Sequence, residues 1–197
     1  MLGAAPVDTG VCARQPEGMG RTIFYTATTL DGFLADEHDS LEWLFVQEQD
    51  PQGPMGYPAF IAHIGAIAMG ATTYQWLVDH LARSGEEWSY TMPSWVFTHR
   101  DLPVIGERIT LTQDPVADVH AQMAAAAGDQ DLWVVGGGDL ACQFAELGLL
   151  DELMLSIAPV TLGSGRPLFP QPFDLRLVEH ARNGAFLCAR YEVVGRR

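Results

Sequence analysis

The chain has 197 residues and a mass of 21.5 kDa, enough for one compact domain, and 48% of its residues are hydrophobic, so it can bury a large core. Twenty-five acidic against 11 basic residues give a formal net charge of −14, which disfavours nucleic acid and membrane surfaces as partners. All 11 basic residues are arginine, so the chain lacks the lysine of P-loop hydrolases, pyridoxal enzymes and Schiff-base aldolases. A small-molecule substrate is therefore the expected partner.

The first 20 residues show no hydrophobic periodicity and lack the basic start and apolar run of a signal peptide. They predict a flexible tail (1–20) in front of one domain (21–197). The three cysteines, Cys12, Cys142 and Cys188, are widely spaced, and the histidines show no metal-binding spacing. We expect free thiols in a reducing, cytoplasmic compartment and no metal.

From residue 21 onward, short apolar runs alternate with segments of helical composition. In chain order these predict a strand at Thr22–Thr28, a turn at Asp31-Gly32, a helix at Leu41–Gln47, a non-helical Pro/Gly loop at Gln49–Pro58, a strand at Ile64–Met69, a helix at Gln75–Ala82, strands at Trp95–Thr98 and Arg108–Thr112, a helix at Asp118–Ala127, a strand at Leu132–Val135, a helix at Leu140–Leu147 and a strand at Glu152–Ile157. An antiparallel pair, Leu175–His180 and Phe186–Val193, follows and is joined by Asn183-Gly184. This order predicts an α/β fold with a mostly parallel sheet, an antiparallel C-terminal hairpin and helices on both faces.

Two turns between a strand and a helix suggest a binding site. Gly136–Gly138 follows one strand, and glycines there let a ligand approach the backbone and the free amides of the next helix. Gly70–Thr73 (GATT) repeats this arrangement with hydroxyl groups. Each turn also has a simpler interpretation, as a packing device or as an N-cap. An ordinary Rossmann site is disfavoured, because residues 155–158 (LSIA) offer no carboxylate for a ribose.

The order of these motifs resembles the dihydrofolate reductase-like superfamily. The motifs are LDG at Leu30–Gly32, the GATT turn, a strand that ends in Thr98, the glycine run, and GSGRPLF at Gly163–Phe169. The resemblance covers about residues 21–194 and is closest to the reductase domain of riboflavin-biosynthesis deaminase-reductases and its stand-alone relatives. It implies a three-layer fold, NADPH bound across the strand ends, and often a homodimer.

The resemblance and the side-chain chemistry together define candidate site residues. The candidates for cofactor binding are Gly70, Thr72, Thr73, Thr98, His99, Arg100, Gly136, Gly137, Gly138 and Asp139. The candidates for substrate binding are Leu30, Gly32, Trp43 and Arg166, of which Arg166 could meet a phosphate and Trp43 a flat heterocycle. Asp31 and Glu42 are the candidate proton sources, although Asp31 is equally well explained as a turn residue.

Some residues depart from these patterns. Many dihydrofolate reductases carry arginine where this chain has Ala71, which leaves NADH possible beside NADPH. The pterin-binding carboxylate three residues before an aromatic would fall on Ser40 if that aromatic is Trp43, which disfavours true dihydrofolate reduction. Phe33 follows LDG where the riboflavin-pathway relatives often carry a basic residue.

The sequence therefore predicts an NAD(P)H-dependent reductase of a pterin- or pyrimidine-type compound, resembling 5-amino-6-(5-phosphoribosylamino)uracil reductase. The alternatives are a nucleotide-binding module with weak or no catalysis, acting as a redox sensor, or a purely structural dimer whose glycine turns serve packing.

Overall fold

The computed structural model describes residues 20–197, so the predicted tail, apart from Gly20, and Cys12 lie outside the described residues. The strands are β1 (Thr22–Thr29), β2 (Phe33–Ala35), β3 (Ile64–Gly70), β4 (Ser94–Phe97), β5 (Ile109–Thr112), β6 (Asp131–Gly136), β7 (Glu152–Ala158), β8 (Arg166–Pro167), β9 (Phe173–Asn183) and β10 (Phe186–Arg196). The helices are α1 (Glu42–Phe45), α2 (Tyr57–Ile61), α3 (Ala71–Ser84), α4 (Val116–Ala127) and α5 (Gly138–Glu146). None of the helices in residues 20–197 is long and apolar enough to cross a membrane.

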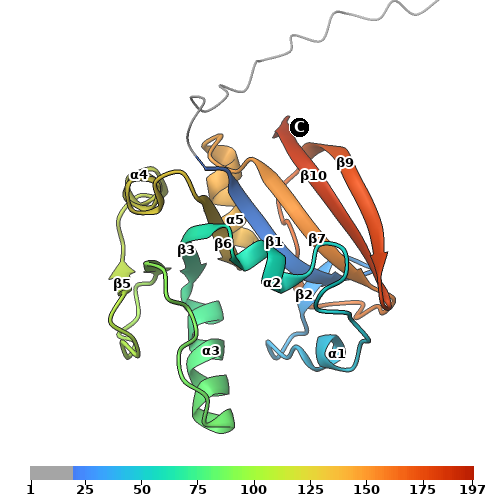
Figure 1. The fold of residues 1–197 in the computed structure, drawn as a ribbon, viewed down its shortest axis with the longest axis horizontal. Coiled ribbons are helices and arrows are strands. Elements are labelled where there is room, and N and C mark those ends of the chain that lie inside the picture. The colour runs from blue at the N-terminus through green and yellow to red at the C-terminus, as the bar shows by residue number, and fades with distance from the viewer. Residues whose placement is uncertain (1–19) are drawn as a thin grey trace, which may run out of the picture.

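Eight strands form the central sheet, in the order β5-β4-β3-β6-β1-β7-β10-β9 (Figure 1). The strands from β5 to β7 all run parallel, whereas β10 is antiparallel to both β7 and β9. The expected α/β fold, with a mostly parallel sheet and an antiparallel C-terminal hairpin, is confirmed. Because the parallel strands share one direction, the turns that follow β3, β4 and β6 gather at one edge of the sheet.

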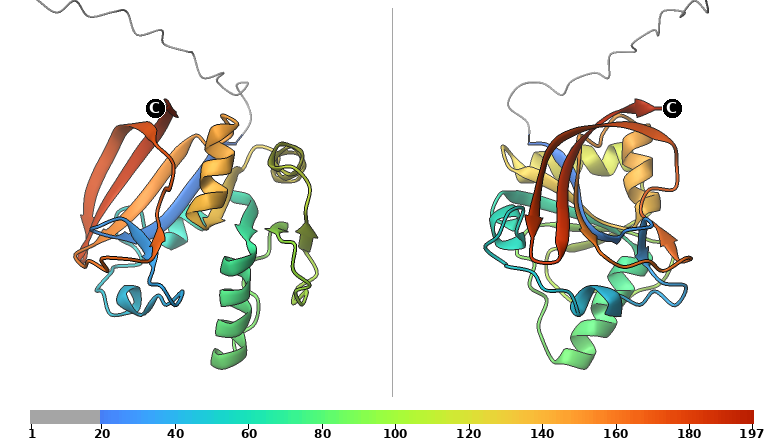
Figure 2. Two further views of the ribbon diagram at one scale, coloured as in Figure 1. Left: turned by 180° about the vertical axis from the view of Figure 1, so that it is seen from behind. Right: turned by 90° about the vertical axis from the view of Figure 1, so that its right-hand side faces the viewer.

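Hydrophobic side chains cover both faces of the sheet. On one face α4 and α5 pack through residues such as Met123 and Phe144, and neither side chain is exposed. On the other face Phe60 of α2 and Tyr74 of α3 lie against Trp133 and its neighbours. Figure 2 shows α5 in orange against its face of the sheet and the β9–β10 hairpin in red beside it.

Helix α3 continues from β3 and extends beyond the edge of the sheet (Figure 1). Only Tyr74 is buried among its 14 residues. The helix predicted at Gln75–Ala82 begins four residues earlier, at Ala71, so the last three residues of GATT form its first turn. In the same way α5 begins at Gly138 rather than at Leu140. Glycine adjoining a helix start lowers helix propensity, which is why composition alone places both starts too late.

The C-terminal hairpin turns one residue later than the sequence predicts. Asn183 is still paired with Phe186, so Gly184 and Ala185 form the turn. Asn183 is buried, and its side chain accepts a hydrogen bond from the Asp50 amide (2.9 Å) and donates to the carbonyls of Asp50 and Pro54. Its amide therefore fastens a distant loop instead of occupying the turn.

Two other predictions change in detail. The helix expected at Leu41–Gln47 is one turn, Glu42–Phe45, without a buried residue. The loop expected at Gln49–Pro58 ends early, because α2 starts at Tyr57 with a proline in its first turn, a position where the missing amide costs nothing. The small antiparallel ribbon of β2 and β8 is not predictable from the sequence, because both strands are too short to show a period.

Candidate functional site

A cavity of about 800 Å³ lies at the carboxyl edge of the sheet. This volume is typical of sites for small molecules and cofactors. The cavity extends from the end of β4, past the starts of α3 and α5, to β1, β2 and β8. All ten candidate cofactor residues line it: Gly70, Thr72, Thr73, Thr98, His99, Arg100, Gly136, Gly137, Gly138 and Asp139.

The start of α3 presents free amides to the cavity. Gly70 is the N-cap residue, in an extended conformation, and no side chain caps the helix. The threonines that follow are therefore not N-caps of their own helix. The first amides of a helix lack internal partners and, together with the helix dipole, favour an anion.

The start of α5 repeats this arrangement beside the first one. Gly137 is its N-cap, again without a side-chain cap, and the peptide bond between Gly136 and Gly137 is cis. A Cβ on Gly70 would lie 3.8 Å from the Gly136 carbonyl oxygen, and one on Gly136 would lie 3.2 Å from Thr73 Oγ1. The two turns therefore adjoin, because β3 and β6 are paired strands.

The glycines of the second turn serve different purposes. A Cβ on Gly137 would meet no protein atom within 4 Å, so the backbone there borders open space in the cavity wall. A Cβ on Gly138 would lie 2.4 Å from the Leu168 carbonyl oxygen and 2.5 Å from that of Pro167. Gly137 is thus accessible to a ligand, whereas Gly138 allows the β8 segment to pack against α5. Two adjoining helix starts with open backbone between them fit the diphosphate of a dinucleotide.

The turn after β4 forms the far end of the cavity. Thr98 is buried and stabilises the turn, since its hydroxyl oxygen accepts a hydrogen bond from the Arg100 amide (2.9 Å). His99 and Arg100 are exposed. Within residues 20–197 Arg100 forms no ion pair, so its guanidinium group can meet an anionic ligand.

The LDG turn is not part of the cavity wall: Leu30, Asp31 and Gly32 do not line the cavity. The Asp31 carboxylate accepts hydrogen bonds from the Thr29 hydroxyl (2.6 Å) and from the amides of Gly163 (2.7 Å) and Leu162 (3.0 Å). The hydrogen bond from Thr29, followed by those of the two amides, holds the pKa of Asp31 below its usual value. This carboxylate joins two loops, which favours the turn role over proton transfer.

Glu42 and Trp43 also lie outside the cavity lining. Glu42 is exposed on α1. Trp43 packs against Phe186 and Cys188 instead of forming a slot for a ligand. Its neighbour Leu44 is the α1 residue that lines the cavity.

Arg166 lines the cavity near β2, but it is paired. Its Nε donates to Asp39 Oδ1 (2.6 Å) and its Nη2 to Asp39 Oδ2 (3.1 Å). This hydrogen-bonded pair, and the charge of Asp139, raise the pKa of Arg166. Asp39 is a site residue that sequence reasoning missed, because it lies 127 positions from its partner.

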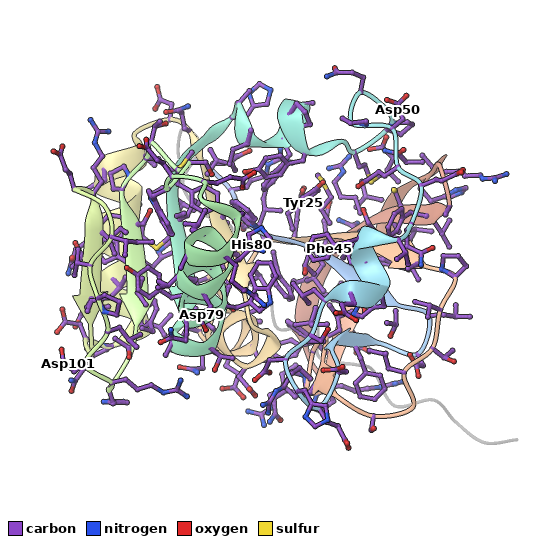
Figure 3. The ribbon with its side chains drawn as sticks, turned by 90° about the horizontal axis from the view of Figure 1, so that it is seen from below. Tyr25, Phe45, Asp50, Asp79, His80 and Asp101 are labelled. Atoms are coloured by element: carbon purple, nitrogen blue, oxygen red, sulfur yellow. The ribbon has the colours of Figure 1, made fainter. Side chains whose placement is uncertain are left out.

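Three aromatic rings meet beside the cavity. Trp76 and His80 of α3 stack at 4.9 Å between ring centroids, and Phe45 of α1 lies nearly parallel to both, at 6.2 and 6.3 Å. Figure 3 shows Phe45 and His80 approaching each other from the two helices. Trp76 is not among the sequence-derived site residues, yet it lines the cavity. Only the four-residue spacing of Trp76 and His80 on one helix face could have indicated this.

Solved structures share this fold. A candidate riboflavin biosynthesis protein from Shewanella sp. PV-4 superimposes with a TM-score of 0.72 at 23% identity, covering 88% of this chain and 98% of that one. The Thermotoga maritima diaminohydroxyphosphoribosylaminopyrimidine deaminase/5-amino-6-(5-phosphoribosylamino)uracil reductase superimposes with a TM-score of 0.60 at 13% identity. The match covers 89% of this chain and 57% of the Thermotoga chain. A dihydrofolate reductase from Enterococcus faecalis, complexed with NADP(H), superimposes with a TM-score of 0.55 at 13% identity, covering 89% of this chain and 97% of that one. The dihydrofolate reductase-like fold is thereby established.

Sequence relatives agree with the structural ones. The uncharacterized protein YwjB of Bacillus subtilis (strain 168) is 29% identical over 150 residues, which cover 76% of this chain and 82% of YwjB. A family model for the RibD C-terminal domain matches residues 22–188, nearly the whole described domain with both helix-start turns. The chain therefore belongs to the RibD C-terminal domain family.

Proposed function

We propose that this protein is a reductase that uses a nicotinamide dinucleotide, with NADPH as the preferred form, to reduce a pterin- or pyrimidine-type compound. The observation that carries the proposal is that two uncapped helix starts meet in one cavity with Arg100, which forms no ion pair within residues 20–197. The amides of α3 and α5 would hold the diphosphate, with Gly137 allowing its close approach. His99 and Arg100 would hold the ribose 2′-phosphate.

Bound NADPH would supply the hydride for reduction of a C=N bond or of the imine of an opened sugar. The side chains that would face the reacting rings are uncharged, namely Thr26 and Ala27 of β1 and Leu34 of β2. The proton would come from solvent water, because neither Asp31 nor Glu42 lines the cavity. The protein would then contribute binding, orientation and exclusion of bulk water.

A nucleotide-binding module without catalysis is the second candidate. It is favoured by the same position of Asp31 and Glu42, which leaves the site without an assigned acid. Such a module would bind NADPH but oxidise it with none of a panel of pterins, pyrimidines and quinones. The homodimer that the resemblance implies stays a prediction, which sedimentation equilibrium would test.

Thermal unfolding with NADPH, NADH or FMN tests the proposal. A ligand at about 100 times its Kd adds roughly 2.7 kcal/mol of stability, which for a chain of this size raises Tm by about 5–10 °C. We expect NADPH to give the largest shift and to be oxidised with at least one pyrimidine or pterin of the panel. The absence of a shift with both nicotinamide dinucleotides would exclude the reductase and the binding module alike, and would leave the structural dimer.

A further inference from the structure

The end of the cavity near β1 and β2 is mainly uncharged. It is lined by the uncharged side chains of Thr26, Ala27, Leu34, Leu44 and Trp76, most of which are apolar. A planar heterocycle fits such a surface, since stacking and apolar contact do not require charge.

Arg166 is the guanidinium group at this end, and the carboxylate that pairs with it, Asp39, lies on a loop that is held in place. Asp39 lies on a tight loop, where the Asp36 carboxylate accepts hydrogen bonds from the His38 and Ser40 amides (2.8 and 2.9 Å). Arg166 belongs to β8 and is paired with Ala35 of β2. The bidentate ion pair therefore joins two anchored segments, and exposed salt bridges matter more when their geometry is fixed in this way.

The one arginine at this end is neutralised by its partner. Asp39 binds the guanidinium group through two hydrogen bonds, so the positive charge of Arg166 is matched by one negative charge. Within residues 20–197, the arginines that line the cavity are Arg166 and Arg100, and Arg100 lies at the opposite end. A phosphate brought to Arg166 would compete with the Asp39 carboxylate that already occupies the guanidinium group, and would be repelled by it.

We propose that the substrate of this protein carries no phosphate: it is a pyrimidine or pterin, as the free base or its riboside. The proposal rests on the proposed function and refines it. It sets this chain apart from the Thermotoga protein, which is named for a phosphoribosyl compound. The Asp39–Arg166 pair is the specificity-determining feature, because it removes the cation that a phosphate would need.

Calorimetric titration of the complex with NADP⁺ tests this, because the oxidised cofactor prevents turnover. The probes are 6-ribosylaminouracil and its 5′-phosphate. We expect the riboside to bind at least about tenfold more tightly than the phosphate. Asp39→Asn should reduce this ratio roughly tenfold by freeing Arg166. Asparagine suits the position, since residue 39 has a φ of 60°.

Two further variants locate the effect. Adding Arg166→Gln to Asp39→Asn should restore the original ratio. Asp114→Asn removes the same charge from the other end of the cavity and should leave the ratio unchanged. Tighter binding of the phosphate to the unaltered protein, binding of neither probe, or an unchanged ratio in Asp39→Asn would overturn the substrate assignment. Failure to bind NADP⁺ would be seen first and would overturn the proposed function as well.

Discussion

Gly138 has no room for a side chain, and this predicts a specific loss of stability. In Gly138→Ala the new methyl group would lie 2.4 Å from the Leu168 carbonyl oxygen and 2.5 Å from that of Pro167. Both neighbours are backbone atoms, so the β8 segment must move by about an ångström to restore ordinary contact distances. Overpacking of this kind costs about 2 kcal/mol. For a chain of this size, that cost lowers Tm by about 4–8 °C.

Gly137→Ala is the matched control, one residue earlier in the same turn. Its methyl group would meet no protein atom within 4 Å, so we expect a much smaller change in Tm. It would, however, occupy the space where a ligand phosphate comes close to the backbone, and should weaken NADPH binding at least about tenfold. Thermal unfolding without ligand and calorimetric titration with NADPH measure the two effects separately. Equal Tm values for Gly138→Ala and the unaltered protein would contradict this packing argument, as would a larger loss of stability in Gly137→Ala than in Gly138→Ala.

Three further changes test the surroundings of the site. Arg100→Ala should weaken NADPH about tenfold or more and NADH much less in parallel titrations, and equal losses would remove Arg100 from the 2′-phosphate site. Asp31→Asn should lower Tm and leave turnover nearly unchanged, because the carboxylate joins two loops away from the cavity. A large loss of turnover at unchanged Tm would instead support a role for Asp31 in proton transfer. Burial lowers the pKa of His120, which lies 2.9 Å from the Thr22 hydroxyl, so the folded protein binds fewer protons than the unfolded chain. The stability that this group contributes is present above about pH 6.5 and is lost as the pH falls. Urea unfolding at about pH 8 and about pH 5 should therefore show a smaller loss of unfolding free energy in His120→Gln than in the unaltered protein. Equal losses in the two proteins would contradict this linkage.

The parts of the fold that short-range patterns encode could be predicted from the sequence. Residues 64–69 (IGAIAM) are apolar on both faces and form the buried β3, and the glycine run lies at a helix start as its composition indicates. The meeting of the two glycine turns could also be inferred, because the carboxyl ends of parallel strands share one edge. The predicted bounds of helices were wrong mainly at their first residues, because a glycine that favours a turn can also begin a helix.

Long-range side-chain contacts could not be predicted. Asn183 has the composition of a hairpin turn, yet its amide binds a loop more than 120 residues away. Asp31 looks like an available acid until the amides of Leu162 and Gly163 occupy it. Asp39 lines the cavity and pairs with Arg166, which is 127 positions away. Short-range sequence patterns do not indicate such hydrogen-bonded pairs, because the pairs depend on which loops the folded sheet brings together.

The direct passage of β3 into α3, and of β6 into α5 across a single residue, affects how this site can change. Neighbouring strands in a sheet lie about 4.8 Å apart, so the spacing between the two groups of helix amides is set by backbone pairing. An insertion in either turn would alter that spacing, whereas the segments around Asp36–Leu41 and after β4 can lengthen without disturbing it. The proposed phosphate-binding turns thus keep a fixed spacing, whereas the segments at the two ends of the cavity can change, so new specificities can arise at those ends.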